Sequence, residues 1–284
     1  MPPANTKPRV FLIGNAEKSE VPEPFRRLSD LLSSRGLLAG SDLQCQPENI
    51  NPAEPDYVVA LGGDGTILAV GQAMQHRQVP IVGVNLGKLG YLADFSVDEL
   101  ERDFGRILGD PDLVSRRMML DVRLDAAAGD KPYDGIALND CVIRVAQPFR
   151  TVGLAVDIDG DPVTTIISDG LIVSTPTGST AHNMSCGGPI VQPDVDAIIL
   201  TPLCPHSLTH RPVVVGPQAK LGITVRATST GAALVLDGQF IRALPGGSRL
   251  VITRSKQSFQ LVRNPARKGW DTLVQKLKWG QGLT

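Results

Sequence analysis

Short apolar runs alternate with helical segments in the first third of the chain. The runs Arg9–Ile13, Tyr57–Leu61 and Pro80–Val84 predict buried strands. Pro24–Leu32 and Val97–Leu108 place their apolar residues three or four positions apart, which predicts amphipathic helices. Strands that alternate with helices in this way favour an α/β domain with a doubly wound, mostly parallel sheet.

The periodicity changes at about Met118. Strand-like runs then follow one another, separated by Asp-Gly, Pro-Gly or Gly-Gly turns, which is typical of a β-rich domain. The tail Gly269–Trp279 returns to helical spacing and predicts a closing amphipathic helix. We therefore expect an α/β domain over 1–115, a β-rich domain over 116–264, and a helix within 265–284 that packs back on the first domain. The predicted strands are Met119–Leu124, Gly135–Val145, Val152–Ile158, Thr164–Ser174, Ala197–Thr201, Gly222–Ala227, Ala233–Leu236 and Arg249–Thr253.

Composition narrows the function classes. The 284 residues are 42% hydrophobic and 20% charged with a net charge of −1, which is typical of a globular chain. Near-neutral charge gives no global attraction to nucleic acid or to an anionic membrane, so neither is expected as a partner. The longest apolar runs, such as Ala197–Leu200, fall far short of the roughly 20 residues of a membrane-spanning helix. With no leader-like segment before Val10, we expect a cytoplasmic protein.

The cysteines and histidines suggest neither a disulfide framework nor a zinc knuckle. The four cysteines, at positions 45, 141, 186 and 204, contain no C-x-x-C pair and indicate free thiols. Cys204, His206 and His210 do lie within seven residues. Pro205 opposes the helix that would align them as metal ligands. We therefore expect no protein-bound zinc, and a polar loop that faces a ligand.

A glycine-rich segment, Gly62–Thr66, separates a predicted strand from a predicted helix, Ile67–Met74. Glycines let the backbone approach a ligand closely, and the amides at a helix start favour an anion such as phosphate. A carboxylate beside phosphates binds a metal ion or accepts a proton from a hydroxyl, which makes Asp64 a candidate for chemistry. A tight turn with a capping Asp would explain the same pattern. The chain has neither a Walker G-x-x-x-x-G-K-[ST] nor a G-x-G-x-x-G motif.

Two further segments carry polar residues beside predicted strands. Asp169–Asn183 ends in hydroxyls, a proline and a glycine, which suit a phosphate or a ribose, although an ordinary Ser/Thr loop has the same composition. Asn139 and Asp140 lie between strand-like residues, where a paired amide and carboxylate need a partner. Vicinal ribose hydroxyls or a cross-strand hydrogen bond would supply it.

Six segments follow one another over roughly residues 57–240: LGGDGTIL, VNLGKLGYLADF, ALNDCVI, SDGLIVSTPTGSTAHNMSCGGPIV, TPLCPHSLTHRPVVV and LDGQ. Together they resemble the bacterial-type NAD kinase family. GGDGT alone also resembles phosphofructokinases and lipid kinases of the diacylglycerol and sphingosine type. The STPTGSTA block combined with CPHSL and DGQ is much more specific for the NAD kinase family.

The resemblance implies an N-terminal α/β domain, an all-β, β-sandwich-like C-terminal domain and a site in the crevice between them. It implies an enzyme that transfers the terminal phosphoryl group of ATP, or inorganic polyphosphate, to the adenosine-ribose 2′-hydroxyl of NAD. Mg²⁺ would be carried largely by the donor phosphates. Asp64 matches the family's catalytic base. The positions that match NAD or nucleotide contacts are Asp64, Gly65, Tyr91, Asn139, Asp140, Arg150, Asp169, Thr180, Ala181, His182, Asn183, Met184, Ser185, His206 and Gln239.

Two of these positions depart from the family pattern. Asp140 stands where the family usually has Glu, so its carboxylate is one methylene shorter. His182 stands where the family usually has Tyr, and its ring still allows stacking. Both changes bear on dinucleotide affinity more than on the chemistry.

The resemblance also implies a homodimer or homotetramer. The apolar runs Val213–Val215 and Ala233–Leu236 have no charged edge protection, and self-association would cover them. Two other functions stay open from the residues alone. One is a lipid or sugar kinase that shares GGDGT, and the other is a non-catalytic NAD(P)-binding sensor.

Overall fold

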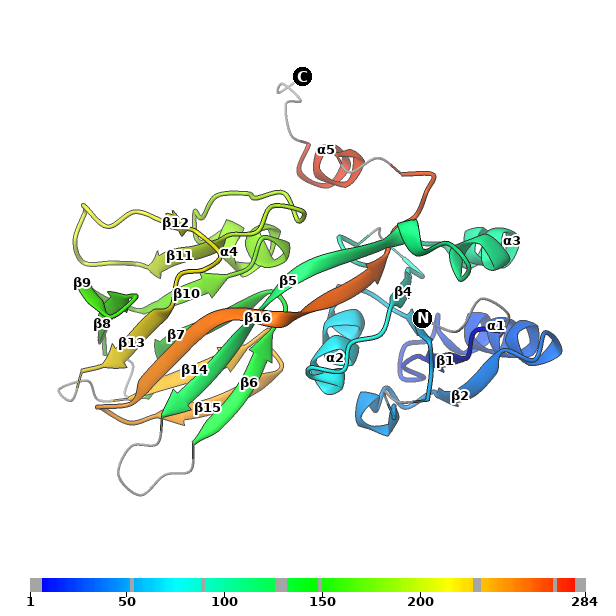
Figure 1. Cartoon of the computed structure of the whole chain (residues 1–284), viewed down its shortest axis with the longest axis horizontal. Coiled ribbons are helices and arrows are strands. Elements are labelled where there is room, and N and C mark those ends of the chain that lie inside the picture. The colour runs from blue at the N-terminus through cyan, green and yellow to red at the C-terminus, as the bar shows by residue number, and fades with distance from the viewer. Residues whose placement is uncertain are drawn as a thin grey trace. The chain divides into compact units, whose positions relative to one another are not determined.

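The computed structural model describes residues 7–51, 54–87, 90–125, 132–147, 150–226, 231–267 and 270–278. The chain forms two compact units. Unit 1 consists of residues 1–116 and 259–284, and unit 2 consists of residues 117–258. The chain passes from one unit to the other within two long strands, β5 (Val114–Asp125) and β16 (Arg249–Val262), which are labelled in Figure 1.

Unit 1 is a parallel sheet with helices. Its other elements are β1 (Val10–Ile13), α1 (Pro22–Ser34), β2 (Leu38–Asp42), the 3-10 turn Pro47–Asn49, β3 (Tyr57–Leu61), α2 (Asp64–Met74), β4 (Ile81–Val84), α3 (Val97–Ile107), the 3-10 turn Pro111–Leu113 and α5 (Asp271–Leu277). The strand order is β2–β1–β3–β4–β16, and every pair is parallel. The predicted α/β domain with a mostly parallel sheet is confirmed.

Helices cover both faces of this sheet, which explains why β3 and β4 are buried along their whole length. On one face, Phe25 of α1 and Phe104 of α3 join the core that contains Val82 and Val84. Alternate residues of a strand point to opposite faces. A Cβ at Gly83 would lie 2.4 Å from Cδ1 of Ile67, so α2 covers the other face.

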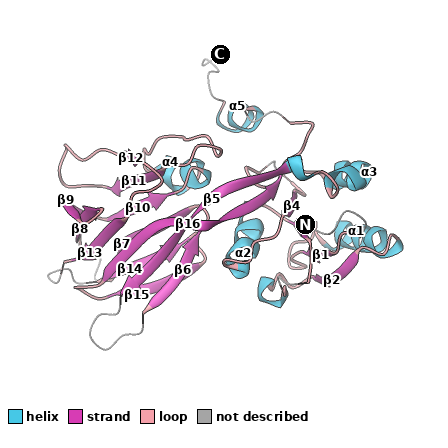
Figure 2. Ribbon diagram, viewed as in Figure 1, coloured by secondary structure: helices cyan, strands magenta, loops and turns pink. Residues whose placement is uncertain are grey.

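Unit 2 is a β-sandwich. Its elements are β6 (Tyr133–Ala137), β7 (Asp140–Val145), β8 (Val152–Ile158), β9 (Asp161–Ser168), β10 (Gly170–Ser174), the 3-10 turn Thr177–Thr180, α4 (His182–Ser185), β11 (Ile198–Leu203), β12 (Val213–Val215), β13 (Leu221–Val225), β14 (Ala232–Leu236) and β15 (Phe240–Leu244). One sheet has the order β12–β11–β10–β7–β14–β15, and the other contains β16–β13–β8–β9 with β5 and β6. Side chains from both sheets form one core, for example Ile143 and Leu234 with Leu154 and Leu250. Figure 2 shows strands as the main regular structure of this unit, with the short helix α4 and loops beside them.

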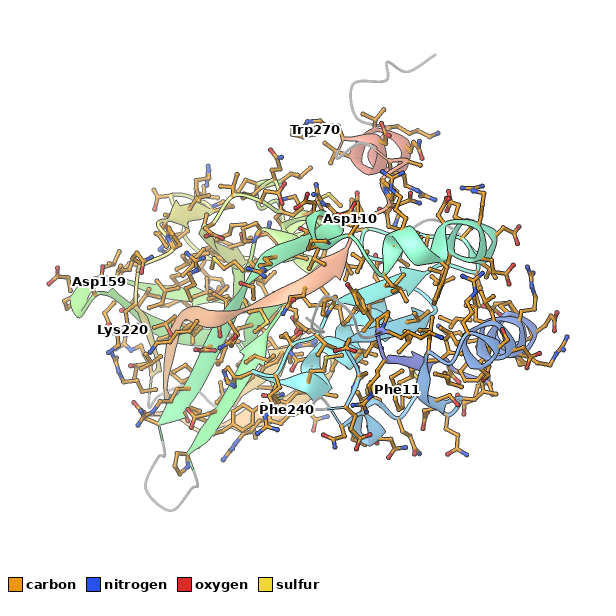
Figure 3. The ribbon with its side chains drawn as sticks, turned by 45° about the vertical axis from the view of Figure 1, so that its right-hand side comes forward. Phe11, Asp110, Asp159, Lys220, Phe240 and Trp270 are labelled. Carbon is orange, nitrogen blue, oxygen red and sulfur yellow. The ribbon has the colours of Figure 1, made fainter. Side chains whose placement is uncertain are left out.

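An Asp-Gly turn closes the hairpin of β8 and β9, as the sequence indicated. Asp159 and Gly160 have φ values of 56° and 91° between β8 and β9. The Asp159 carboxylate accepts a hydrogen bond from the Lys220 N–H at 2.9 Å, and both side chains are labelled in Figure 3. At another edge the rings of Tyr133 and Phe240 stack with centroids 4.5 Å apart.

Several boundaries differ from the predicted ones. The run Gly135–Val145 is two strands, β6 and β7, and the run Thr164–Ser174 is split at Asp169. Unit 2 ends at residue 258, six residues before the expected domain end at residue 264, and the last residues of β16 belong to unit 1, where Leu261 pairs with Ile81 of β4. The predicted tail helix is α5, which also belongs to unit 1; Gly269 and Trp279 lie outside the described residues.

Candidate functional site

Asp64 opens α2 directly beyond the carboxyl end of β3. The turn between them depends on Gly62, whose φ is +151°, and an added Cβ there would lie 2.4 Å from Oγ1 of Thr66. Gly65 is exposed, and a Cβ there would meet no atom within 4 Å. The glycine-rich segment therefore leaves open space beside a half-buried carboxylate at the start of a helix.

The Asp64 carboxylate is held by three successive backbone amides. Oδ2 accepts from the N–H of Tyr91 at 2.9 Å, and Oδ1 accepts from the N–H groups of Leu92 at 2.8 Å and Ala93 at 3.2 Å. Gly90 permits this approach, because a Cβ there would lie 2.1 Å from Oδ1. Oδ1 is thus fully used, whereas Oδ2 accepts only one of these hydrogen bonds and keeps acceptor capacity for a substrate hydroxyl.

Tyr91 has a buried hydroxyl that, among the described residues, has no hydrogen-bond partner. Burial, and then the nearby charge of Asp64, raise the pKa of the Tyr91 phenol. The Lys276 ammonium lies 4.5 Å from the centroid of the ring. The Tyr91 backbone therefore lies beside the candidate base, and its side chain carries a hydroxyl without a partner among the described residues.

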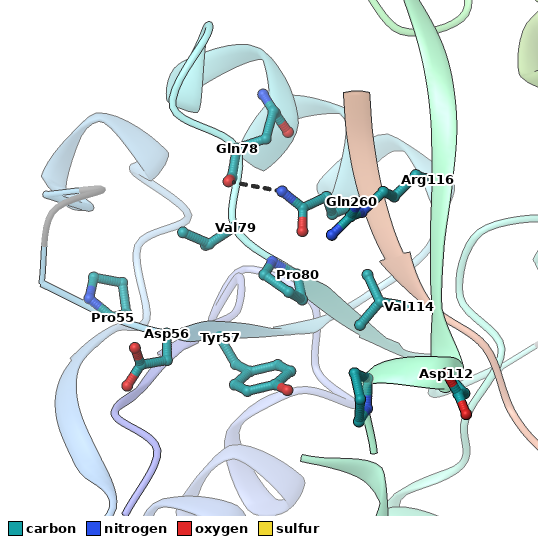
Figure 4. Close-up of a pocket in the computed structure, with 11 residues that line it drawn as sticks. Pro55, Asp56, Tyr57, Gln78, Val79, Pro80, Asp112, Val114, Arg116 and Gln260 are labelled. Atoms are coloured by element: carbon teal, nitrogen blue, oxygen red, sulfur yellow. Dashed lines mark hydrogen bonds between the residues drawn. The ribbon is translucent and has the colours of Figure 1, made fainter. Parts of the chain in front are cut away.

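A cavity of about 580 Å³ in unit 1 lies at the opposite end of the strands. Tyr57 begins β3 and Pro80 precedes β4, and both line it (Figure 4). The Gln260 side chain donates to the carbonyl of Gln78 at 3.1 Å across one wall. Since Asp64 lies beyond the other end of β3, this cavity is separate from the candidate chemistry.

Unit 2 has a pocket of about 280 Å³ that gathers four of the predicted contact residues. Its wall includes Asn139 and Asp140 at the start of β7 and Ala181 and His182 at the start of α4. Sequence reasoning missed the other polar members, which are Arg144 and Asp237.

Asp237 holds the Asn139–Asp140 segment in place. Its carboxylate accepts from the N–H groups of Leu138 at 2.8 Å, Asn139 at 2.7 Å and Asp140 at 2.9 Å. Its own N–H donates to the carbonyl of Asp140 at 3.0 Å, and the Thr175 N–H donates to that of Asn139 at 2.8 Å. The LDGQ motif contained this residue, but Asp-Gly indicated only a turn.

The two predicted ribose contacts are both buried. Asn139 Oδ1 has no hydrogen-bond partner among the described residues, so a ligand donor would satisfy it. Burial, and then the neighbouring charge of Asp237, raise the pKa of Asp140 to about 7. A buried amide and a carboxylate that titrates near neutrality are groups that bind vicinal hydroxyls.

The segment after β10 is stiffened by its own polar side chains. Asn183 uses both amide hydrogens, on the carbonyls of Ser179 at 3.2 Å and Pro189 at 3.0 Å, and accepts from the Thr201 hydroxyl at 2.6 Å. The Ser179 hydroxyl accepts from the Val191 N–H at 3.0 Å, so it ties two loops together instead of capping α4. The Asn183 side chain therefore stabilises the segment after β10 by joining it to Pro189 and Thr201.

The remaining predicted contacts lie outside the lining of this pocket. Thr180 and Met184 are half-buried, and the exposed positions are Arg150, Asp169, Ser185, His206 and Gln239. Backbone hydrogen bonds fix several of them, such as that from the His206 N–H to the carbonyl of Ile167 at 3.0 Å.

Within the described part of the chain, no three His, Cys, Asp or Glu side chains gather as a metal site would require. None of the described helices is long and apolar enough to cross a bilayer.

Two family models match the chain. Residues 14–111 match the ATP-NAD kinase N-terminal domain, and residues 138–264 match the ATP-NAD kinase C-terminal domain. The chain is 40% identical over 230 residues to an NAD kinase of Geotalea daltonii, with 81% of each chain covered. It is 33% identical over 276 residues to an NAD kinase of Rhodopirellula baltica, covering 97% of this chain and 88% of the relative.

Solved structures have the same fold. The yeast NADH kinase complexed with NADH has a TM-score of 0.84 at 23% identity, covering 99% of this chain and 90% of that one. An NAD kinase from Archaeoglobus fulgidus in complex with ATP has a TM-score of 0.77 at 27% identity, covering 95% and 98%. With both domain models matched over most of its length, the chain belongs to the ATP-NAD kinase family.

Proposed function

We propose that this protein is an NAD kinase that transfers the terminal phosphoryl group of ATP to the adenosine-ribose 2′-hydroxyl of NAD, which yields NADP. The observation that carries the proposal is the Asp64 carboxylate, fixed by the amides of residues 91–93 with acceptor capacity left on Oδ2. Oδ2 would accept the proton of the 2′-hydroxyl as the new P–O bond forms. Phosphoryl transfer asks the protein mainly for such positioning.

Asn139 and Asp140 would bind the ribose of NAD. The unpartnered Oδ1 of Asn139 and the carboxylate of Asp140 both accept hydrogen bonds, which suits two neighbouring hydroxyls. His182, on the same pocket wall, offers a ring for stacking. The backbone N–H groups of residues 138–140 donate hydrogen bonds to the Asp237 carboxylate. The side chains of Asn139 and Asp140 would therefore be oriented before the ligand binds.

A divalent cation, Mg²⁺, would come with the donor phosphates. The residues at this position fit a cation that arrives with phosphates, because Asp64 supplies one carboxylate beside a helix start that attracts phosphate. When bound, the cation neutralises the phosphate charge that develops during transfer. The chain's own contribution is the orientation of Asp64 and of the ribose.

The decisive assay incubates the protein with NAD, ATP and Mg²⁺ and resolves NADP. Parallel reactions replace ATP by inorganic polyphosphate and NAD by NADH, which assigns donor and acceptor. Formation of NADP supports the proposal. NAD binding without ATP consumption would refute it in favour of the sensor. In reactions that also contain a lipid or a sugar, phosphorylation of that acceptor alone would refute it in favour of the lipid or sugar kinase.

A homodimer or homotetramer is part of the proposal. β12 is an edge strand of the six-stranded sheet, and its Val213 and Val214 are 51% and 49% exposed. The expectation that Ala233–Leu236 needs covering was wrong, because β14 pairs with β7 and β15 on its two sides. Light scattering with activity measured across dilution tests assembly, and a fully active monomer would refute it.

The cytoplasm is the proposed location. The described cysteines, Cys45, Cys141, Cys186 and Cys204, are all free thiols, which fits a reducing compartment. Fractionation of the source cells, with the enzyme followed by its activity, tests this location.

A further inference from the structure

The segment that follows β16 is fastened to the loop that holds Asp64. The Asn264 N–H donates to Oδ2 of Asp94 at 3.0 Å, and its side-chain Nδ2 donates to the carbonyl of Asp94 at 3.0 Å. Asn264 is 4% exposed, so water competes little for these bonds. Asp94 directly follows Tyr91, Leu92 and Ala93, the residues whose amides bind the Asp64 carboxylate. Asn264 therefore fixes the end of that loop through both backbone and side chain.

Arg267 closes the same loop from another side. The guanidinium Nε of Arg267 lies 3.4 Å from Oδ1 of Asp94, and its Nη2 lies 3.4 Å from Oε2 of Glu99. Glu99 also forms the capping box at the start of α3, where its carboxylate accepts from the Ser96 N–H at 2.8 Å. Burial alone would raise the pKa of Glu99, but the hydrogen bonds from Ser96 and the charge of Arg267 lower it overall. Arg267 thus joins Asp94 to a helix start that is itself fixed.

A third contact comes from α5. Lys276 places its ammonium 4.5 Å from the centroid of the Tyr91 ring, a cation–π distance. The Tyr91 N–H is the group that donates to Oδ2 of Asp64, the oxygen with acceptor capacity left. The part of the chain after β16 therefore contacts both ends of the run 91–94.

We propose that Asn264 and Arg267 are positioning residues for Asp64: by holding Asp94 they keep the amides of residues 91–93 where they orient the carboxylate. The inference rests on the proposed role of Asp64 as base. Displacement of a reacting group by about 1 Å is enough to lower a rate roughly 100-fold. Neither residue touches Asp64, so their effect passes through the loop.

The opposing explanation is that these contacts only close the fold of unit 1. Their loss would then lower stability without a selective effect on turnover. Arg263 provides a matched control, because it precedes Asn264 and its side chain donates to the carbonyl of Asp112 at 3.0 Å, away from the loop.

The first test compares Asn264→Ala, Arg267→Ala, Arg267→Lys and Arg263→Ala in the full chain. We expect Asn264→Ala to lower kcat about 10- to 100-fold while KM for ATP and for NAD changes less than about twofold. Arg267→Ala should lower kcat about 3- to 10-fold. Arg267→Lys should keep most of the parent kcat, and Arg263→Ala should keep all of it. If Asn264→Ala does not fold, the two Arg267 variants decide. Reduced thermal stability with kcat unchanged would overturn the inference.

The second test asks whether the effect passes through Asp64. In an Asp64→Asn background, adding Asn264→Ala should lower the residual rate less than about twofold, because the group being positioned is already gone. Full additivity of the two losses would overturn the inference. Full turnover by Asp64→Asn alone would instead refute the proposed base.

Hydrogen exchange at the amides of residues 91–93 gives a readout that does not depend on activity. It should be faster in Asn264→Ala than in the parent and unchanged in Arg263→Ala. Unchanged exchange in Asn264→Ala would overturn the inference even if the base role of Asp64 stands.

Discussion

Asp140→Asn is expected to stabilise the unliganded protein at pH 8 and to weaken its binding of NAD. Asp140 is 5% exposed, and its pKa is raised to about 7 by burial and then by the charge of Asp237. The folded state therefore holds a proton on Asp140 at pH values where the unfolded chain has already lost it. Stability falls as pH rises from about 4 to about 7, and the full penalty is present above that range.

The magnitude follows from the size of the shift. The rise from 3.8 to about 7 corresponds to about 4 kcal/mol at pH 8, an upper bound for the gain on removing the charge. At pH 4 the gain should be close to zero. The same substitution removes a charged acceptor for ribose, which is worth about 1.5–3 kcal/mol and so weakens NAD binding roughly 10- to 150-fold.

The assay pairs thermal unfolding at pH 4 and pH 8 with calorimetric titration of NAD. Asp134→Asn is the control and should change neither quantity, because Asp134 is exposed on β6, the preceding strand in the chain, which belongs to the other sheet. In the parent, NAD affinity should rise with pH through about 7 as Asp140 ionises. A melting temperature that drops equally at both pH values, or unchanged NAD affinity in Asp140→Asn, would refute the reasoning.

Three further substitutions distinguish the proposed catalytic base from the residues that hold the proposed site residues in place. Asp64→Asn should keep dinucleotide binding by calorimetry yet lower NADP formation about 10²–10⁴-fold; turnover within threefold of the parent would exclude Asp64 as base. Gly90→Ala should also lower kcat, because its Cβ would lie 2.1 Å from Oδ1 of Asp64, and an unchanged kcat would contradict the observed approach. Asp237→Asn should lower the melting temperature by several degrees and weaken NAD binding, because one of the amides of residues 138–140 would face an N–H₂ group instead of an acceptor; parental values of both would show that the carboxylate is dispensable.

Much of unit 1 could be predicted because its central strands are buried on both faces. Tyr57–Leu61 is apolar at every position and matches β3. β2 was missed because its sequence, Leu38–Asp42, is half exposed at the sheet edge and carries no apolar run. Local pattern predicts an element only where burial dictates the residue type.

The candidate site was predictable as a set of side chains but not as a geometry. Asp64, Asn139 and Asp140 stood out because charged or amide groups beside apolar strands are unusual. The split between β6 and β7 follows from a hydrogen bond between Leu138 and Asp237, 99 residues apart, which no local pattern encodes. The amides that bind Asp64 leave no signal either, because every residue type except proline supplies a backbone N–H.

Asp64 in unit 1 and Asp237 in unit 2 are bound by their surroundings in the same way. Asp64 and Asp237 each accept from three successive backbone amides. Asp64 is half-buried, and one of its oxygens retains acceptor capacity, so the amides orient a carboxylate that is available to a substrate in the proposed reaction. Asp237 accepts two of its hydrogen bonds on Oδ1 and one on Oδ2, as Asp64 does, but it is only 7% exposed, so here the carboxylate orients the amides and, with them, Asn139 and Asp140. The same substitution to Asn should therefore remove chemistry at the first position and support at the second.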